Sequence, residues 1–462
     1  MHLNKQFIQT IVPHAVLGAQ DVPLYPTFSV DTRTLQPGDI FIAIEGQHVN
    51  GHDFIDQALQ KNAGGIIAGL DHQEVIEKKY KKELKNKFVL FVPNTTQALI
   101  ELAKSWRQQF TIPIVGVTGS MGKTSTKEMI AAMMQASGKQ YIASYGNQNT
   151  AIGASLHILR LNSSHAFAVF EMGIGPDENM SRIADVVRPT LAVITAIAHA
   201  HVETFGSLEN IATEKRKICS YFNPENICII NGDVPVLTKA SYKHPVVKFG
   251  TKLTNQFQVR NIKIKNNSLS FIAKIYDKKY SVLLPTVHAA SAMHVIAGLA
   301  VAYFLHIPLE GAIQAAQEKS ATKGRFEFVP ASEQGVMIHD AYNANVESMK
   351  AGLQAFDHYD TKRKKVAVIG DMRELADKSV GLHKIVGRFL AKLKTIDHIF
   401  LVGDMVDYCK DYISEPQLVA HVKTAQEVIP LLEPYINQDT IVYFKASNGV
   451  GLGKVIHHFQ EL

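Results

Sequence analysis

The fold of this 462-residue chain is decided by the stretch Thr118-Gly119-Ser120-Met121-Gly122-Lys123-Thr124-Ser125. The apolar run before it, Ile112 to Val117, predicts a buried parallel strand. The residues after it, Thr126 to Met134, have apolar side chains at helical spacing. A strand, a glycine-rich loop with lysine and a hydroxyl, and a helix are typical of a loop that binds nucleotide phosphates. We therefore expect an ATP site in an α/β domain.

The residue types of this loop also suit Mg²⁺. Lys123 would neutralise the terminal phosphates, and the Thr124 hydroxyl would reach the ion. The strict pattern of such loops has a glycine where this chain has Val117, so only the shorter form T-G-x-x-G-K-T-[ST] is present. The alternative is a glycine-rich turn with an exposed lysine, which the flanking strand and helix disfavour.

Length and composition narrow the class of protein. A chain this long suggests roughly three domains. The net charge of +6, from 48 basic and 42 acidic residues, suits an acidic substrate but is too diffuse to indicate nucleic-acid binding. The densest basic run, Lys78 to Lys82, lies between two glutamates and predicts a solvated surface.

We expect a cytoplasmic protein without a membrane-inserted segment. The three cysteines have neither metal-like spacing nor the number needed for a disulfide framework, which fits a reducing compartment. The first residues lack the apolar core of a signal peptide. The most apolar long stretch, Leu283 to Ile307, contains three histidines and many small residues, so it predicts a buried helix rather than a membrane span.

Apolar runs alternate with helical patterns along most of the chain, which predicts parallel α/β sheets. The strands expected before the phosphate loop are residues 39–44 and 64–68, with helices at 54–61 and 95–109. The strands expected after it are residues 167–171, 191–196, 227–231, 336–339, 365–369, 399–402 and 441–444. Breaks near residues 111 and 319 predict domain boundaries.

Polar residues stand where two predicted strands of the middle segment end. Glu171 ends one strand and His201 follows the next. Ligands of open α/β sheets bind at the carboxyl ends of strands, and Glu171 with Thr124 would suffice to bind Mg²⁺. On sequence alone, Glu171 could also cap a helix or face water, and His201 could be a packed or surface histidine. Lys215, in the predicted helix 208–219, would be an exposed lysine.

The last segment has two similar strand ends. Asp340-Ala341-Tyr342-Asn343-Ala344-Asn345 lies between a predicted strand and a helix, where its polar side chains could merely cap the helix. Gly370-Asp371-Met372 ends the next strand and could be only a turn. Two such strand ends in one segment favour a ligand site at the carboxyl edge of its sheet.

Together these stretches resemble the ATP-dependent Mur ligases of peptidoglycan precursor synthesis. In the middle segment the resemblance lies in the phosphate loop, residues 146–153 (Gly-Asn-Gln-Asn-Thr-Ala-Ile-Gly), Glu171-Met172-Gly173, residues 200–203 (Ala-His-Val-Glu) and residues 205–207 (Phe-Gly-Ser). Gly324-Arg325 opens the last segment. Asp340 to Asn345 with Ser348-Met349, and residues 370–375 with His383, are similar to the family member that adds D-alanyl-D-alanine. Residues 29–33 (Ser-Val-Asp-Thr-Arg) and 51–54 (Gly-His-Asp-Phe) resemble its uridine-nucleotide-binding domain.

The resemblance implies three domains. Residues 1–111 would form a small α/β domain that binds the UDP-linked peptide. Residues 112–319 would form a central, doubly wound, phosphate-loop ATPase-like domain. Residues 320–462 would form a Rossmann-like domain that binds D-alanyl-D-alanine and closes on ATP. The enzyme would be an ATP- and Mg²⁺-dependent ligase that joins D-alanyl-D-alanine to UDP-N-acetylmuramoyl-tripeptide through an acyl phosphate. It would be a monomer that neither binds nucleic acid nor inserts into a membrane.

The resemblance also implies roles for individual residues. The catalytic residues would be Lys123, Glu171, His201 and Lys215. Mg²⁺ would be served by Thr124, Glu171, His201 and, if it is carbamylated, Lys215. ATP would contact Val117, Thr118, Gly119, Ser120, Met121, Gly122, Lys123, Thr124, Ser125, His288, Arg325, Asp340 and Tyr342. The other substrates would contact Ser29, Thr32, Arg33, Asn147, Asn149, Thr150, Asn343 and Asn345.

The chain departs from the family pattern at several positions. Where members usually carry His-Asn-x-x-Asn beside the adenine, this chain reads His288-Ala289-Ala290-Ser291-Ala292. Where they often carry Lys-Gly-Ser-Arg-Gly, it reads Lys445-Ala446-Ser447-Asn448-Gly449. Where members carry Asn-Pro, this chain has Asn345-Val346. Where they carry Ala-Lys-Gly-Glu around the carbamylated lysine, it has Glu214-Lys215-Arg216-Lys217. The alternatives are a related ligase with another acceptor, such as a folylpolyglutamate synthetase-like enzyme, and a non-catalytic nucleotide-binding relative.

Overall fold

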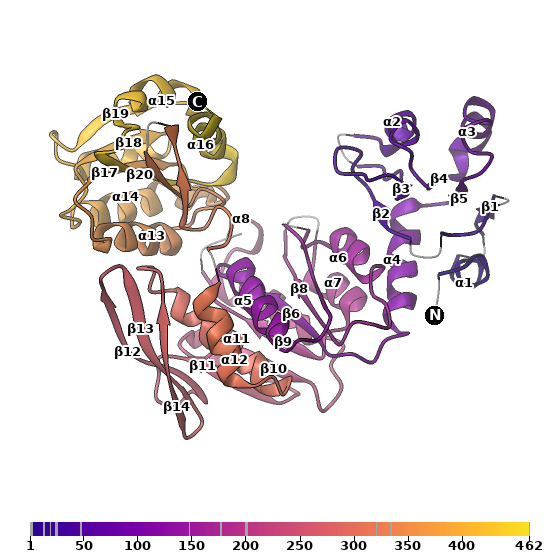
Figure 1. The fold of residues 1–462 in the computed structure, drawn as a ribbon, viewed down its shortest axis with the longest axis horizontal. Coiled ribbons are helices and arrows are strands. Elements are labelled where there is room, and N and C mark those ends of the chain that lie inside the picture. Colours follow the sequence, from indigo (N-terminus) through magenta and orange to yellow (C-terminus); the bar gives the residue numbers. More distant parts are fainter. Residues whose placement is uncertain are drawn as a thin grey trace. The chain divides into compact units, whose positions relative to one another are not determined.

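The computed structural model describes residues 3–12, 14–18, 20–23, 26–46, 49–146, 148–175, 178–198, 202–319, 321–332 and 335–461. Figure 1 shows helices packed on three β-sheets. One sheet falls within each of the three predicted segments. The expected three-domain α/β fold is therefore confirmed. None of the helices in the described ranges is long and apolar enough to cross a lipid bilayer.

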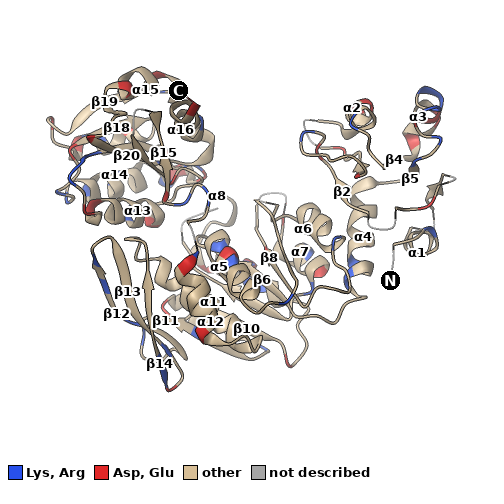
Figure 2. Cartoon of the chain, in the orientation of Figure 1, with Lys and Arg blue, Asp and Glu red and all other residues tan. Residues whose placement is uncertain are grey.

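The N-terminal sheet has the strand order β1-β5-β4-β3-β2, in which only β1 is antiparallel to its neighbour. Its strands are β1 (Val16–Leu17), β2 (Phe28–Ser29), β3 (Ile40–Ile42), β4 (Gly65–Gly69) and β5 (Phe88–Val92). The helices are α1 (Lys5–Ile11), α2 (Ile55–Gln60), α3 (Gln73–Lys79) and α4 (Thr95–Arg107). The basic run at the end of α3 is exposed beside acidic residues (Figure 2), as expected for a solvated surface.

The central sheet has nine strands in the order β14-β13-β12-β11-β10-β9-β6-β8-β7. They are β6 (Ile114–Thr118), β7 (Tyr141–Ala143), β8 (Phe167–Glu171), β9 (Leu191–Ile194), β10 (Ile227–Asn231), β11 (Val246–Gly250), β12 (Phe257–Lys265), β13 (Ser268–Ile275) and β14 (Lys278–Leu284). The helices are α5 (Lys123–Gln135), α6 (Ala151–Ile158), α7 (Met180–Val187), α8 (Val202–Phe205), α9 (Leu208–Arg216), α10 (Pro235–Thr238), α11 (Ser291–Phe304) and α12 (Leu309–Glu318).

Five strands of the central sheet were not predicted, namely β7, β11, β12, β13 and β14. β12, β13 and β14 form an antiparallel meander, so the sheet is mixed rather than wholly parallel. Along β13 buried residues alternate with half-buried ones, the pattern of a strand with one face on the core. Such strands lack the continuous apolar run by which the buried parallel strands are recognised.

The C-terminal sheet has the order β15-β16-β20-β17-β18-β19 and is parallel except for β15. Its strands are β15 (Glu327–Pro330), β16 (Val336–His339), β17 (Lys364–Gly370), β18 (His398–Val402), β19 (Leu418–Val422) and β20 (Thr440–Lys445). One apolar core joins the sheet to α13 (Val346–His358) and α14 (Ser379–Leu390), and a second joins it to α15 (Ala425–Leu432) and α16 (Leu452–Glu461). The helices thus cover both faces, as in a Rossmann-like domain.

The chain divides into two compact units. The first contains Met1–Gly116, Lys139–Leu191 and Lys217–Asn223, and the second contains Val117–Gly138, Ala192–Arg216 and Pro224–Leu462. The phosphate loop, α11 and the C-terminal sheet all belong to the second unit. The domain boundaries expected near residues 111 and 319 stay predictions.

Candidate active site

The phosphate loop connects β6 to α5 through two glycines with unusual backbone angles. Gly119 has a φ of 153°, and Gly122, which precedes α5, has a φ of 78°. A Cβ atom at position 119 would lie 2.0 Å from Thr195 Oγ1, so no side chain fits there. These glycines let the backbone turn tightly enough for its N–H groups to surround a phosphate.

Residues at the ends of β9 and β10 hold the loop. The Ser120 N–H donates to the Ala196 carbonyl oxygen over 2.7 Å, and Thr195 Oγ1 donates to the Met121 carbonyl oxygen over 2.6 Å. Asn231 Nδ2 in turn donates to the Thr195 carbonyl oxygen over 2.8 Å. The sequence analysis missed Thr195 and Asn231. Their only signal is a polar residue at or just after the end of an apolar strand.

Four predicted ATP contacts lie together at the start of α5. Lys123 Nζ donates to the Gly119 carbonyl oxygen over 2.9 Å, which folds the ammonium group back over the loop. The Thr124 hydroxyl accepts a hydrogen bond from Arg325 Nη2 over 3.1 Å. The Arg325 guanidinium carbon lies 4.4 Å from the centre of the Tyr342 ring, so the arginine stacks on that ring. The structure therefore brings two cations to the predicted phosphate position.

A pocket of about 190 Å³ adjoins the loop within the second unit. Its walls combine the loop, the start of α11 and strand ends of the last sheet, and they include Met121, Gly122, His288, His294, Arg325 and Asp340. The predicted residues His288, Arg325 and Asp340 thus share one pocket with the loop. A pocket next to a phosphate loop can hold the rest of a nucleotide.

Two histidines of this pocket have lowered pKa values. Burial lowers the pKa of His288, and the nearby Lys445 cation lowers it further, although Asp340 opposes the change. Burial lowers the pKa of His294 to about 3, with help from His288 and Arg325. A neutral imidazole offers one hydrogen-bond donor and one acceptor.

Asp340 is the centre of a buried hydrogen-bond network at the side of the pocket. Its Oδ2 lies 2.9 Å from Lys445 Nζ and accepts a hydrogen bond of 2.9 Å from the Tyr443 hydroxyl. Its Oδ1 accepts from the Phe326 N–H over 3.2 Å. Burial lowers the pKa of Lys445 and raises that of Tyr443. Asp340 therefore fixes the wall of the pocket, while its contact with ATP stays a prediction.

The two predicted substrate asparagines after Asp340 differ in their surroundings. Asn345 is the N-cap of α13: its Oδ1 accepts from the Ser348 N–H over 2.8 Å, and Ser348 Oγ accepts from the Asn345 N–H. The capping alternative thus accounts for Asn345. Asn343 lines the pocket, and its carbonyl oxygen accepts a hydrogen bond of 3.3 Å from Lys445 Nζ.

Glu171 is a buried carboxylate at the end of β8, in the first unit. Its Oε1 accepts a hydrogen bond from Asn149 Nδ2 over 2.9 Å, and its N–H donates to Ser144 Oγ over 2.9 Å. Neither capping a helix nor facing water describes this position. Thr150 is the N-cap of α6, where its hydroxyl accepts from the Gly153 N–H. The predicted substrate residue Asn149 therefore positions Glu171.

Lys215 lies on α9 with none of its surface exposed to solvent. The expectation of an exposed lysine, drawn from the sequence alone, was wrong. The helix packs Lys215 and its neighbour Glu214 inward although both are charged residue types. His201 and Asn147, which the resemblance also assigned to the site, lie outside the described residues.

The predicted uridine-nucleotide residues lie at the end of β2 and on the turn after it. The Ser29 hydroxyl donates to the Asp31 carbonyl oxygen over 3.0 Å, and the Thr32 hydroxyl donates to Gln57 Oε1. Arg33 is exposed and pairs with Asp31 at 2.6 Å. The hydrogen bond from Arg33 lowers the pKa of that carboxyl group. Ser29 and Thr32 thus shape the turn, and Arg33 presents a cation to solvent.

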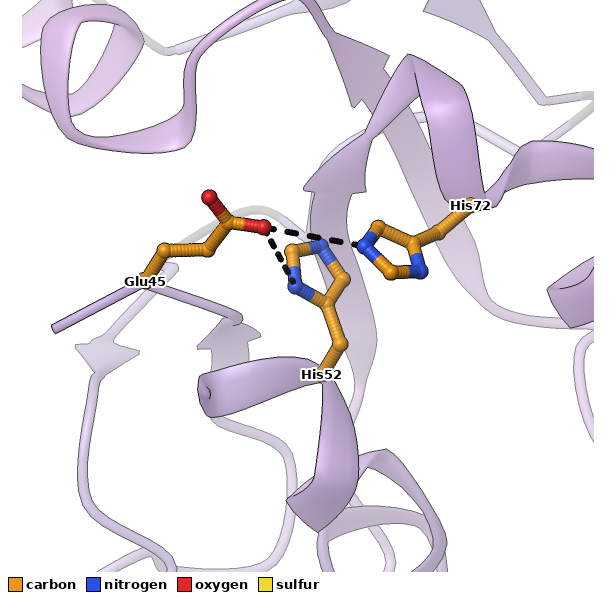
Figure 3. A group of neighbouring side chains, drawn as sticks. All are labelled: Glu45, His52 and His72. Carbon is orange, nitrogen blue, oxygen red and sulfur yellow. Dashed lines mark ion pairs between the residues drawn. The ribbon is translucent and has the colours of Figure 1, made fainter. Parts of the chain in front are cut away.

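In the N-terminal segment, Glu45, His52 and His72 form a group with metal-like spacing (Figure 3). The two imidazole rings stack with their centres 3.9 Å apart. His52 Nε2 accepts a hydrogen bond from the Gly69 N–H over 2.8 Å, so its Nδ1 carries the proton and donates to Asn50 Oδ1 over 2.7 Å. A cation on Nδ1 would require the opposite tautomer and would set two N–H groups against each other. His52 is therefore built to support its loop rather than to bind a metal.

Asp371 and His383, two further residues of the resemblance, hold the chain after β17. The Asp371 carboxylate accepts from the Val406 N–H over 2.7 Å and the Asp404 N–H over 3.2 Å. His383 Nε2 accepts from the Met372 N–H over 3.1 Å, and its Nδ1 donates to the Ser379 carbonyl oxygen over 2.8 Å. The turn interpretation thus fits Asp371.

Three family models match consecutive parts of the chain. They are described as Mur ligase family, catalytic domain, at residues 27–107, Mur ligase middle domain, at residues 117–302, and Mur ligase, glutamate ligase domain, at residues 324–448.

Relatives match over nearly their whole length. A UDP-N-acetylmuramoyl-tripeptide–D-alanyl-D-alanine ligase of Synechocystis sp. is 31% identical, over 92% of this chain and 90% of its own. A crystal structure of MurF from Acinetobacter baumannii has a TM-score of 0.82 at 25% identity and covers 99% of this chain and 98% of its own. MurF ligase from Thermotoga maritima in complex with ADP has a TM-score of 0.76 at 25% identity and covers 95% and 97%.

Proposed function

The chain belongs to the Mur ligase family, and we propose that it joins D-alanyl-D-alanine to UDP-N-acetylmuramoyl-tripeptide with cleavage of ATP to ADP and phosphate. It is an ATP-dependent ligase. The observation that carries the substrate assignment is the near-complete coverage of relatives named for this reaction. A phosphate loop with Lys123 folded over it and Arg325 bonded to Thr124 supplies the matching local geometry.

The reaction has two steps. First, a terminal carboxylate oxygen of the tripeptide attacks the γ-phosphorus of ATP, the bond to the bridging oxygen breaks, and ADP leaves. The amine of D-alanyl-D-alanine then attacks the carbonyl carbon of the acyl phosphate, and the tetrahedral intermediate collapses to an amide, releasing phosphate and a proton. Phosphoryl transfer depends on alignment and charge neutralisation, which Lys123 and Arg325 provide.

The family resemblance assigns a Mg²⁺ ion, which prefers oxygen ligands, to four residues. They are Thr124, Glu171, His201 and, if it is carbamylated, Lys215. Among them, Glu171 has a buried carboxylate, the type of ligand that Mg²⁺ prefers. Carbamylation would turn the buried Lys215 from a cation into an anionic oxygen ligand. When bound, the ion would add positive charge beside the phosphates.

We further propose the division of labour implied by the resemblance. Residues 1–111 bind the UDP-linked peptide, residues 112–319 bind ATP, and residues 320–462 bind D-alanyl-D-alanine and close over the reacting groups. Closure would keep water from the acyl phosphate. We expect a cytoplasmic monomer. Its three cysteines are buried and none forms a disulfide, in keeping with a reducing compartment.

Phosphate release tests the reaction. The full-length protein would be given ATP, Mg²⁺ and UDP-N-acetylmuramoyl-tripeptide, with D-alanyl-D-alanine, D-alanine, L-lysine or L-glutamate as the amine. The proposal is supported if D-alanyl-D-alanine is the only one of these amines that causes phosphate release and if a product of the expected mass forms. Release only with another amine indicates a ligase for a different acceptor. Release with none indicates a non-catalytic relative.

A further inference from the structure

The start of α11 lacks the side chains expected to recognise the base of ATP. Ala289 and Ala292 stand at the two positions where an amide is usual, and alanine makes no side-chain hydrogen bond. The pocket nevertheless extends from the phosphate loop to this helix. If a side chain of α11 recognises the base, it must therefore be another polar side chain of this helix that lines the pocket.

His294 lies on α11 beside the phosphate loop, where its side chain lines the pocket. It is on the same face of α11 as Ser291, three residues earlier, and both line the pocket. Its Nε2 lies 3.0 Å from the position that a Cβ atom on Gly122 would occupy, so the ring sits directly above the second glycine of the phosphate loop. A nucleotide whose phosphates lie on the loop would pass beside this ring.

The ring of His294 is available for a ligand. Among the residues that the structure describes, no side-chain hydrogen bond involves either ring nitrogen of His294, whose backbone N–H donates to Ala290 in the first turn of the helix. Packing alone does not explain an imidazole here, because an apolar ring would fill the same space without two polar atoms to desolvate.

The charge state of His294 suits a base rather than a phosphate. Burial and two neighbouring groups with positive or titratable nitrogen, His288 and Arg325, lower its pKa to about 3. A neutral ring can both accept from an exocyclic amino group and donate to a ring nitrogen, whereas an imidazolium could only donate. Adenine presents both kinds of group on its edge.

We propose that His294 hydrogen-bonds the adenine base of ATP and takes the place of the missing amides. This inference rests on the proposed use of ATP at this pocket. It predicts a direct bond between one ring nitrogen and either the 6-amino group or N7 of the base, which a cycle of paired changes in protein and ligand can detect.

The test measures binding of ATP and two analogues to the full-length protein. Purine riboside triphosphate lacks the 6-amino group, and 7-deaza-ATP lacks N7. The proteins are the wild type, His294→Ala, His294→Asn, and the control His306→Asn, which changes an exposed histidine just after the same helix. Inorganic tripolyphosphate reports on the phosphate loop alone.

We expect His294→Ala to weaken ATP binding about tenfold, and His294→Asn to restore most of it. At least one analogue should bind the wild type and His294→Ala equally well, while tripolyphosphate binding and the His306→Asn protein are unaffected. Equal losses for ATP and both analogues would overturn the inference, as would a matching loss for tripolyphosphate. If the wild type binds no triphosphate at all, the proposed function itself fails, which is a different result.

Discussion

Arg325 Nη2 donates a hydrogen bond to Thr124 Oγ1 over 3.1 Å, although 201 residues separate the two side chains in the sequence. Thr124 belongs to the phosphate loop, and Arg325 begins the segment that carries the last sheet. The stacking of Arg325 on Tyr342 holds its guanidinium group in place. One residue of the last segment is thus tied directly to the nucleotide loop.

Replacing Arg325 with lysine should reduce ligation. Lysine keeps the charge but loses the planar fork that can bond a hydroxyl and a phosphate together. We expect kcat/KM for ATP to fall about 10- to 100-fold, with an unchanged unfolding temperature. Steady-state phosphate release and thermal unfolding measure the two effects. Full activity in the variant would mean that Arg325 does not touch the reacting phosphates.

Lys123→Ala should abolish ligation while binding of UDP-N-acetylmuramoyl-tripeptide persists. Lys123 lies over the loop, whereas the predicted uridine-nucleotide residues lie at the end of β2 and on the turn after it. Calorimetric titration of the UDP substrate and phosphate release give the two readouts, and Lys78→Ala, on the exposed end of α3, is the control. Parallel loss of both activities in a folded variant would contradict the division of substrates between domains.

The sequence predicted those elements that depend on local patterns. β8 and β10 have the bounds expected from their apolar runs, and β16 does as well. β13 was missed because its apolar residues alternate with polar ones. An alternating strand is recognised only once its antiparallel neighbours are known.

In the site, too, features set by local sequence were predicted, whereas features set by distant contacts were not. The phosphate loop follows from its own residues, but Thr195 holds it only because β9 ends beside the loop. The burial of Lys215 could not be read from α9, whose sequence is largely polar. Such roles depend on contacts between residues far apart in the chain.

Gly119→Ala should destabilise the protein and abolish ATP binding. The new methyl group would lie 2.0 Å from Thr195 Oγ1. In addition, the backbone φ of 153° at position 119 is unfavourable for alanine. We expect a cost of about 2–4 kcal/mol. Gly138→Ala is the matched control, because its φ is 71° but no atom lies within 4 Å of the new Cβ. It should cost about 1 kcal/mol. Equal shifts in unfolding temperature would exclude the clash with Thr195.

Asp340→Asn should destabilise the C-terminal sheet, because it leaves the buried Lys445 ammonium without its carboxylate. Breaking such a pair costs about 3–5 kcal/mol. The double variant Asp340→Asn/Lys445→Met removes the stranded charge and should recover part of the loss. Denaturant unfolding followed by tyrosine fluorescence measures both variants. An Asp340→Asn protein as stable as the wild type would show that the pair contributes nothing to folding.

His383 should make stability fall in mild acid. Burial lowers its pKa below the ordinary value, and its Nε2 must stay unprotonated to accept from the Met372 N–H. The unfolded chain therefore binds a proton that the folded chain rejects, so stability is complete above pH 6.5 and declines as the pH falls below it. The slope from this residue reaches at most about 1.4 kcal/mol per pH unit. His383→Gln keeps a group that can accept from Met372 but does not titrate, so its unfolding free energy should change less between pH 7.5 and 5.5. If both proteins show the same pH dependence, the acid sensitivity arises elsewhere.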